Sequence, residues 1–123
     1  MEPENDISEI HSLRNMLRSF SDERDWGKFH TPKNLATALS VESAELLEPF
    51  QWLENGRAEE LGADKLAEVR MELADVFAYL VMLADKLNID LVLALAEKIE
   101  LNKLKYPVEM VRGDSRKYSD YES

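Results

Sequence analysis

The sequence contains no cysteine and only two histidines among its 123 residues. The absence of thiols excludes disulfides and thiolate metal sites, and two histidines are too few for a histidine-rich zinc site. Any bound metal must therefore be held mainly by oxygen ligands. Such ligands favour a hard cation, Mg²⁺ first, with Mn²⁺ as its substitute.

Long apolar runs and basic charge are also scarce. No run approaches the ~20 apolar residues that span a bilayer, and the acidic start of the chain, residues 1–6, does not have the form of a signal peptide. We therefore expect a cytoplasmic protein. The net charge of −10 argues against broad electrostatic binding of nucleic acid or of an anionic membrane. It still permits a phosphorylated small molecule that cations bridge to the protein.

The size of the chain indicates one domain, residues 1–123. With 45% hydrophobic residues it can form a core, yet a domain this small leaves much apolar surface exposed. We therefore expect a homo-oligomer.

Apolar periodicity predicts helices at about residues 7–25, 31–48, 64–87 and 90–105 and no strand. Thr31, followed by Pro32, is a capping residue at the start of the second helix. Asn88 can end the third helix, and Asp90 can cap the fourth. We expect the tail, residues 108–123, to be irregular. The fold class is therefore all-α, a four-helix bundle.

Two acidic residues of the second predicted helix do not lie on its solvent face. At roughly 100° per residue from Leu35, Glu42 falls at ~340°, inside the apolar stripe that also contains Leu39 and Leu46. Glu45 falls beside this stripe, at ~280°. Glu48 points away and is expected to be ordinary surface.

The third predicted helix repeats this arrangement. Its apolar stripe includes Val69, and a strip of polar or aromatic residues follows the edge of the stripe: Glu68, Glu72, Asp75 and Tyr79. Carboxylates at the edge of a core are costly unless they are neutralised, and no run of basic residues faces them at salt-bridge spacing. Two helices with acids three residues apart supply four oxygen ligands, which predicts a magnesium site. A di-iron site is disfavoured because neither histidine has an acid three residues upstream.

These residues resemble a known family. Glu42-Ser-Ala-Glu45 and Glu72-Leu-Ala-Asp75 are similar to the E-x-x-E…E-x-x-D motif of the MazG-like all-α nucleoside triphosphate pyrophosphohydrolases. Further segments resemble the dCTP pyrophosphatase branch in the same order along nearly the whole chain: residues 23–26, 29–30, 32–35, 50–52, 75–80, 106–107 and 115–118.

The resemblance implies a reaction, a metal site and an assembly. A (deoxy)nucleoside triphosphate would be hydrolysed between its α and β phosphates, with a metal-activated water as the nucleophile. Glu42, Glu45, Glu72 and Asp75 would be the metal ligands and catalytic residues. The chain would form a MazG-like bundle that assembles as a homodimer or as a homotetramer made of two dimers, with sites shaped by more than one chain.

The resemblance also implies residues that bind the substrate. Trp26 and Trp52 match aromatic residues that hold the base, and Tyr79 matches a residue close to the sugar. Lys98 and Asn102 match residues that contact phosphate and sugar. Arg112 in the tail would close over the phosphates, and His30 would contact the base or a phosphate, or would have a structural role beside the start of a helix.

One position departs from the family pattern. Members specific for dCTP carry a histidine on the first helix, and the matching position here is Leu17. A broader range of dCTP-like or modified nucleotides, as in nucleotide-pool house-cleaning, is therefore expected. Hydrolysis of dUTP or of phosphoribosyl-ATP stays open, because fold and metal site do not fix the base. The alternative from another class is a non-catalytic helical module that binds nucleotide or protein through a vestigial metal site.

Overall fold

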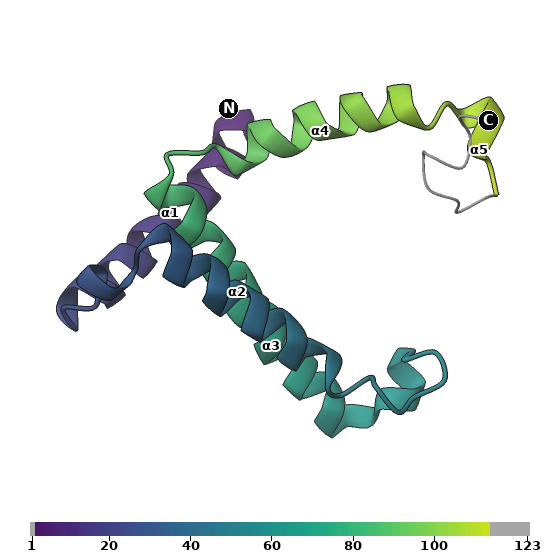
Figure 1. Cartoon of the computed structure of the whole chain (residues 1–123), viewed down its shortest axis with the longest axis horizontal. Helices are drawn as coiled ribbons and strands as arrows, with labels where there is room; N and C mark the ends of the chain where they lie inside the picture. Colours follow the sequence, from purple (N-terminus) through teal and green to yellow (C-terminus); the bar gives the residue numbers. More distant parts are fainter. Residues whose placement is uncertain (1, 114–123) are drawn as a thin grey trace. The chain divides into compact units, whose positions relative to one another are not determined.

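The computed structural model describes residues 2–113, with side chains from Glu9 onward, and every regular element in that range is helical (Figure 1). This confirms the all-α prediction. The described chain divides after Ile89 into two compact units. The first contains α1 (Glu2–Glu23), the 3₁₀ turn η1 (Gly27–Phe29), α2 (Pro32–Leu47) and α3 (Ala58–Lys86). The second contains α4 (Leu91–Lys105) and the short α5 (Val108–Val111).

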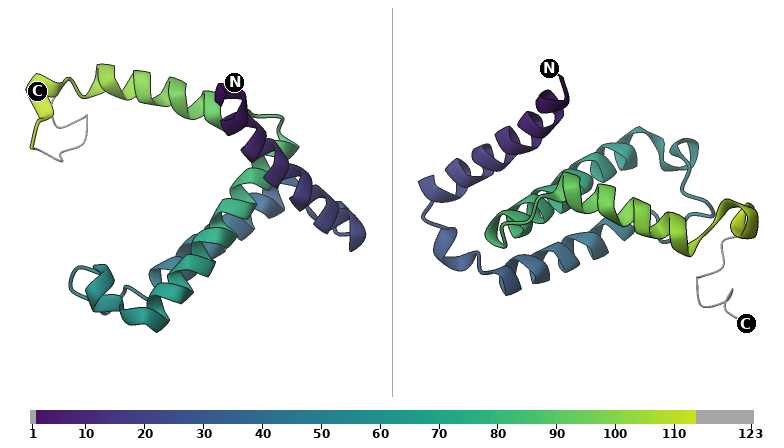
Figure 2. Two further views of the ribbon diagram at one scale, coloured as in Figure 1. Left: turned by 180° about the vertical axis from the view of Figure 1, so that it is seen from behind. Right: turned by 90° about the horizontal axis from the view of Figure 1, so that it is seen from above.

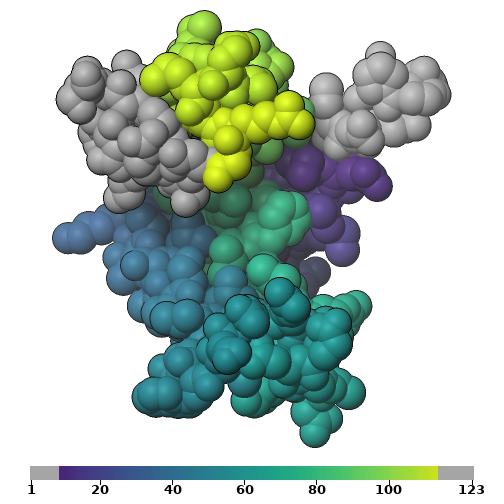
Figure 3. Space-filling model, turned by 90° about the vertical axis from the view of Figure 1, so that its right-hand side faces the viewer, coloured from purple at the N-terminus to yellow at the C-terminus, as the bar shows by residue number. Residues whose placement is uncertain are grey.

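In the first unit, α2 and α3 form an antiparallel hairpin, and α1 crosses the C-terminal part of α3 (Figure 2). Seen in space filling from the end at which their connection lies, the side chains of α2 and α3 meet directly (Figure 3). The buried core is small and consists of Leu35, Leu61, Val69, Val81 and Ala84. None of the described helices is long and apolar enough to cross a membrane.

The predicted caps of α2 and α4 are confirmed. The Thr31 hydroxyl oxygen accepts a hydrogen bond from the Asn34 amide at 3.2 Å, with Pro32 in the first turn. The Asp90 carboxylate accepts one from the Leu93 amide at 3.0 Å. Each side chain satisfies an amide that has no partner within its own helix.

Both α1 and α3 end in a Schellman motif, in which a left-handed residue reverses the chain. Asp25 (φ 55°) ends α1, and Asn88 (φ 57°) ends α3 as the sequence predicted. The amide of Trp26 donates to the Ser21 carbonyl at 2.9 Å, and the amide of Ile89 donates to the Ala84 carbonyl at 2.8 Å. These bonds satisfy carbonyl groups that the helix leaves free.

Two predicted features need correction. A helical segment begins at Ala58 rather than near residue 64, because a turn precedes a break at Gly62, whose φ of 75° and ψ of 171° are not helical. In the predicted irregular tail, residues 108–111 form the helical turn α5, which follows Pro107, since proline favours the position before or at a helix start. Residues 114–123 of that tail lie outside the described residues.

The predicted apolar stripe of α3 is only partly buried. Val69 is buried, but Leu73 and Leu87 remain about half exposed, at 51% and 50%. Within the first unit, α1 and α2 do not cover a stripe this wide, so part of it remains exposed.

Candidate metal centre and adjoining pocket

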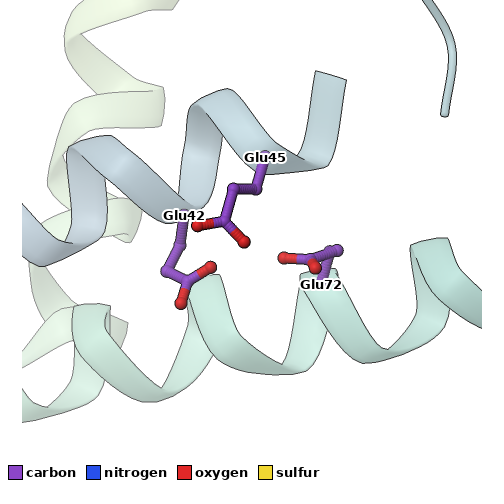
Figure 4. Close-up of side chains that lie close together, drawn as sticks. All are labelled: Glu42, Glu45 and Glu72. Carbon is purple, nitrogen blue, oxygen red and sulfur yellow. The ribbon is translucent and has the colours of Figure 1, made fainter. Parts of the chain in front are cut away.

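Three carboxylates meet between α2 and α3. Glu42 and Glu45 lie one turn apart on α2, and the antiparallel hairpin places Glu72 of α3 opposite them (Figure 4). One carboxylate oxygen from each residue lies within 4.8 Å of the others. All three side chains are half-buried. Like charges this close destabilise one another unless a proton or a cation lies between them.

The electrostatics of the cluster favour a cation. Oε2 of Glu42 and Oε2 of Glu72 are buried and have no hydrogen-bond partner. Burial, followed by the charges of Glu45, Asp75 and Glu72, raises the pKa of Glu42 above its ordinary value. The ion pairs found among the described side chains lie elsewhere. A divalent cation would satisfy the two buried oxygens and remove the repulsion.

The donor set fits Mg²⁺ or Mn²⁺, because it consists only of carboxylate oxygens. Residues Glu42, Glu45 and Glu72 would hold the ion. Their partly exposed position leaves room for water or phosphate oxygens as further ligands, which Mg²⁺ usually keeps. The chemistry of the residues therefore agrees with the predicted metal site.

Asp75 lies at the edge of this cluster. It is not one of the three carboxylates that converge, and its side chain is exposed. Its charge nevertheless raises the pKa of Glu42, so the two side chains are close enough to interact. Asp75 also lines a neighbouring cavity and so connects the carboxylate cluster to that cavity.

The acidic strip predicted on α3 divides between two hollows. Glu68 and Glu72 line an acidic groove beside Glu45, together with Glu48 and Asp64. Asp75 and Tyr79 line the cavity on the other side, toward α1. The expectation that Glu48 is ordinary surface is only partly right, because this exposed residue borders the groove.

The cavity beside Asp75 brings together three of the predicted substrate-binding residues. It has a volume of about 270 Å³, and Trp26, His30 and Tyr79 line it. The remaining lining is mostly apolar: Leu17, Phe20, Ser21, Ala78 and Met82. Ligand pockets commonly combine apolar walls with a few polar groups in this way, and this volume is at their small end.

The end of α1 positions Trp26. The Schellman motif folds the chain back so that the Trp26 ring meets Phe20 edge to face, with ring centroids 5.7 Å apart. Such aromatic pairs are geometrically specific. Trp26 therefore has a defined orientation although it is 43% exposed.

Of the other predicted substrate-binding residues, one lies in the first unit outside the lining of this cavity, and three belong to the second unit. Trp52 lies on the connection between α2 and α3 and is 87% exposed. Lys98, Asn102 and Arg112 belong to the second unit, where Asn102 is half-buried and the other two are exposed. The geometry of the first unit therefore does not test the predicted roles of these three residues.

Sequence reasoning did not identify four lining residues as parts of a site: Phe20, Ser21, Ala78 and Met82. Met82 follows Tyr79 by three residues and so lies on the same face of α3. That spacing was a usable signal. No sequence signal marked Ser21 as part of a site, because its position depends on how α1 crosses α3.

Comparison with known proteins gives a consistent result. Residues 37–121 match the model of the MazG-like family. Human dCTP pyrophosphatase 1 is 40% identical over 113 residues, which cover 90% of this chain and 66% of the human protein. The rat protein of the same name is 38% identical over the same shares. The chain thus spans about two thirds of the length of these curated relatives.

A solved structure is also similar. The crystal structure of a pyrophosphatase from Archaeoglobus fulgidus has a TM-score of 0.75 with this chain and 45% sequence identity. The match covers 80% of this chain and 93% of the archaeal one.

Proposed function

The chain belongs to the MazG-like family, and from this premise we propose that it hydrolyses nucleoside triphosphates to the monophosphate and pyrophosphate. Water adds across the anhydride bond between the α and β phosphates, so that one product keeps the bridging oxygen and the other takes the oxygen of the water. The names of the relatives, dCTP pyrophosphatase and pyrophosphatase, support this reaction.

The convergence of Glu42, Glu45 and Glu72 carries the proposal. These residues and Asp75 hold Mg²⁺, with Mn²⁺ as a substitute. The cation supplies positive charge for the phosphate oxygens and makes water more acidic. The carboxylates fix its position, and Asp75 connects that position to the cavity in which we place the base.

In this proposal the substrate is dCTP or a related deoxynucleotide, including modified ones. Trp26 stacks on the base, and Tyr79 lies near the sugar, because both line the cavity beside Asp75. Lys98, Asn102 and Arg112 contact the phosphates and the sugar. Leu17 lines the same cavity and presents no hydrogen-bonding group to a base, which favours a broader base range.

We further place the enzyme in the cytoplasm as a homodimer or a dimer of dimers that removes unwanted nucleotides from the pool. Exposed apolar side chains support the assembly. On α4, those at positions 92, 93, 95, 99, 101 and 104 are 44 to 78% exposed, and large exposed apolar surfaces usually mark interfaces. Trp52, at 87% exposure, serves the site of a second copy.

Incubation of the purified protein with a panel of deoxynucleoside triphosphates and Mg²⁺ tests the proposal. Monophosphate and pyrophosphate should form in equal amounts, and no product should form when the metal is chelated. Release of single phosphate, or no turnover of any nucleotide, would contradict it. The variant Glu45→Gln should be inactive, whereas Glu9→Gln, an exposed residue of α1 outside the cavities, should keep full activity.

A further inference from the structure

A second cavity lies where α1 crosses α3, and basic side chains gather in its wall. Its volume is about 230 Å³. Five of its lining residues carry charge: Arg14, Arg18 and Asp22 from α1, and Asp85 and Lys86 from α3. Three positive charges therefore meet two negative ones, in a chain whose net charge is −10. The wall of this cavity differs in sign from the chain as a whole.

The two carboxylates of this cavity are engaged by Arg18. Nε and Nη2 of Arg18 donate to the two oxygens of Asp85, and Asp22 interacts with the same guanidinium group through its charge. The ion pairs found among the described side chains include neither Arg14 nor Lys86. The hydrogen bonds of Arg14 go to the uncharged amide oxygen of the next residue. Two cations of the cavity are thus left for an anion.

A buried hydroxyl group adds a donor to this wall. Ser21 is 7% exposed, and it lines the cavity together with His30. Its hydroxyl oxygen lies 3.4 Å from Nδ1 of His30, which is long for a hydrogen bond. Because a hydroxyl proton can turn toward a better acceptor, an anionic oxygen in the cavity would receive a shorter and stronger bond.

This cavity lies far from the carboxylate cluster. At 1.5 Å per residue, Lys86 is roughly 21 Å from Glu72 along α3, a distance that a triphosphate chain does not span. The cavity adjoins the one beside Asp75, with which it shares Leu17 and Met82. An anion bound here is therefore a different group from the phosphates placed at the carboxylate cluster.

We propose that this cavity is a metal-independent binding site for a small phosphate-type oxyanion, inorganic phosphate or pyrophosphate. Arg14 and Lys86 supply the positive charge, and the Ser21 hydroxyl donates a hydrogen bond. These donors come from two crossing helices, an arrangement that suits a tetrahedral ion with acceptors in several directions. The volume of about 230 Å³ is below the ~300 Å³ at which drug-sized ligands begin to fit, so the occupant is small. The site goes beyond the proposed function, because it requires neither the metal nor hydrolysis.

Calorimetric titration of the full chain with orthophosphate and with pyrophosphate, in EDTA at constant ionic strength, tests this site. At least one of the two anions should bind. Arg14→Gln and Lys86→Gln should each weaken its binding roughly tenfold, the effect of losing one charge-assisted hydrogen bond. Lys65→Gln is the matched control, since it makes the same change in net charge at an exposed position of α3 outside this cavity, and it should leave binding unchanged.

A gain of affinity provides a second test that a merely structural role would not produce. Asp22 lines the cavity and is exposed, so Asp22→Asn removes a repelling charge. It should tighten anion binding roughly threefold, the size of one exposed charge interaction. Failure of both anions to bind the wild type would overturn the site. Equal weakening in Lys65→Gln would also overturn it, because net charge alone would then explain the attraction.

The nucleotide site is separated from this one by titration with dCMP in the presence of Mg²⁺. Lys86→Gln should leave dCMP binding unchanged, and a weakening equal to that seen for the anion would show that Lys86 serves the nucleotide instead. Hydrolysis of triphosphates without anion binding in EDTA would overturn this inference alone. Anion binding that depends on Arg14 and Lys86, without hydrolysis of any triphosphate, would overturn the proposed function alone.

Discussion

Arg18 of α1 forms a bidentate ion pair with Asp85 of α3 through two nitrogens of its guanidinium group. Nε of Arg18 donates to Oδ2 of Asp85 at 2.8 Å, and Nη2 donates to Oδ1. The two residues are 67 positions apart in the sequence. Their ion pair therefore links α1 to α3 where the two helices cross, beside the cavities. Arg18 is half exposed, whereas the Asp85 side chain is only 19% exposed.

This pair predicts a pH dependence of stability. The hydrogen bond from Arg18 holds the pKa of Asp85 below its ordinary value, and the charges of Arg18, Arg14 and Lys86 act in the same direction. A lowered carboxyl pKa stabilises the folded state above the unfolded-state value of about 3.9. The contribution disappears as the pH falls through the folded-state pKa. Wild type should therefore be more stable than Asp85→Asn at pH 6, and the difference should shrink below about pH 4.

Urea unfolding at pH 6, 5, 4 and 3 measures this difference. Asp22→Asn is the matched control, because Asp22 interacts with Arg18 through charge alone and should have a smaller effect. A difference between wild type and Asp85→Asn that stays constant down to pH 3 would contradict the assignment.

The carboxylate cluster predicts that Glu42→Gln is more stable than the wild type without metal and less stable than the wild type with Mg²⁺. Without metal, Glu42→Gln should raise the melting temperature, because it removes a charge that Glu45, Asp75 and Glu72 repel. With Mg²⁺ at ~100 times its Kd, the wild type should gain ~2.7 kcal/mol from binding, and the variant should gain little. Its hydrolytic activity should fall at least ~100-fold, since even the residues that support metal ligands cost 10–100-fold when lost.

Thermal unfolding with and without Mg²⁺ measures the difference in melting temperature between Glu42→Gln and the wild type in both conditions. Glu9→Gln should follow the wild type in both conditions, because it lies on α1 away from the cluster. A variant that is less stable than wild type without metal would mean that Glu42 has a structural partner.

Close packing at the connection between α2 and α3 predicts a strong effect at Gly56. This residue has a φ of 73°, and a Cβ atom there would lie 2.7 Å from the ring of Phe50. Gly56→Ala should destabilise the chain by ~2 kcal/mol or more, from left-handed strain of ~1–2 kcal/mol together with overpacking. Gly27→Ala is the control, because nothing lies within 4 Å of its Cβ position. Chemical denaturation should show the first effect and a nearly neutral control.

Glu60 also stabilises the connection between α2 and α3. Its carboxylate accepts hydrogen bonds from the amides of Glu54, Asn55 and Gly56, at 3.1, 2.9 and 2.6 Å, and these bonds lower the pKa of Glu60. Glu60→Ala should therefore speed hydrogen exchange of these three amides while α2 stays protected. Unchanged exchange at the three amides would show that the carboxylate does not restrain this connection.

Local patterns predicted the helices, because caps such as Thr31 and Asp90 act within four residues. Periodicity also identified Glu42 as an acid inside an apolar stripe and Glu45 as an acid beside it, since a helix fixes directions within itself. It could not show that Asp75 would separate from Glu72 and face the cavity, because this depends on how α1 and α2 each approach α3. The same long-range geometry placed Ser21 beside His30.

Position 17 carries the last prediction. Leu17 lines the cavity with Trp26 and His30, at the position for which the family resemblance implies a histidine in members specific for dCTP. Leu17→His would add a hydrogen-bonding group beside the one that His30 offers, so the site could bind two edges of one base. The ratio of kcat/KM for dCTP over dTTP should rise about fivefold, the effect of one hydrogen bond of ~1 kcal/mol, mainly through KM. Leu17→Met, which keeps the site apolar, should leave the ratio unchanged. An equal loss for both nucleotides would mean that position 17 only packs against the cavity wall.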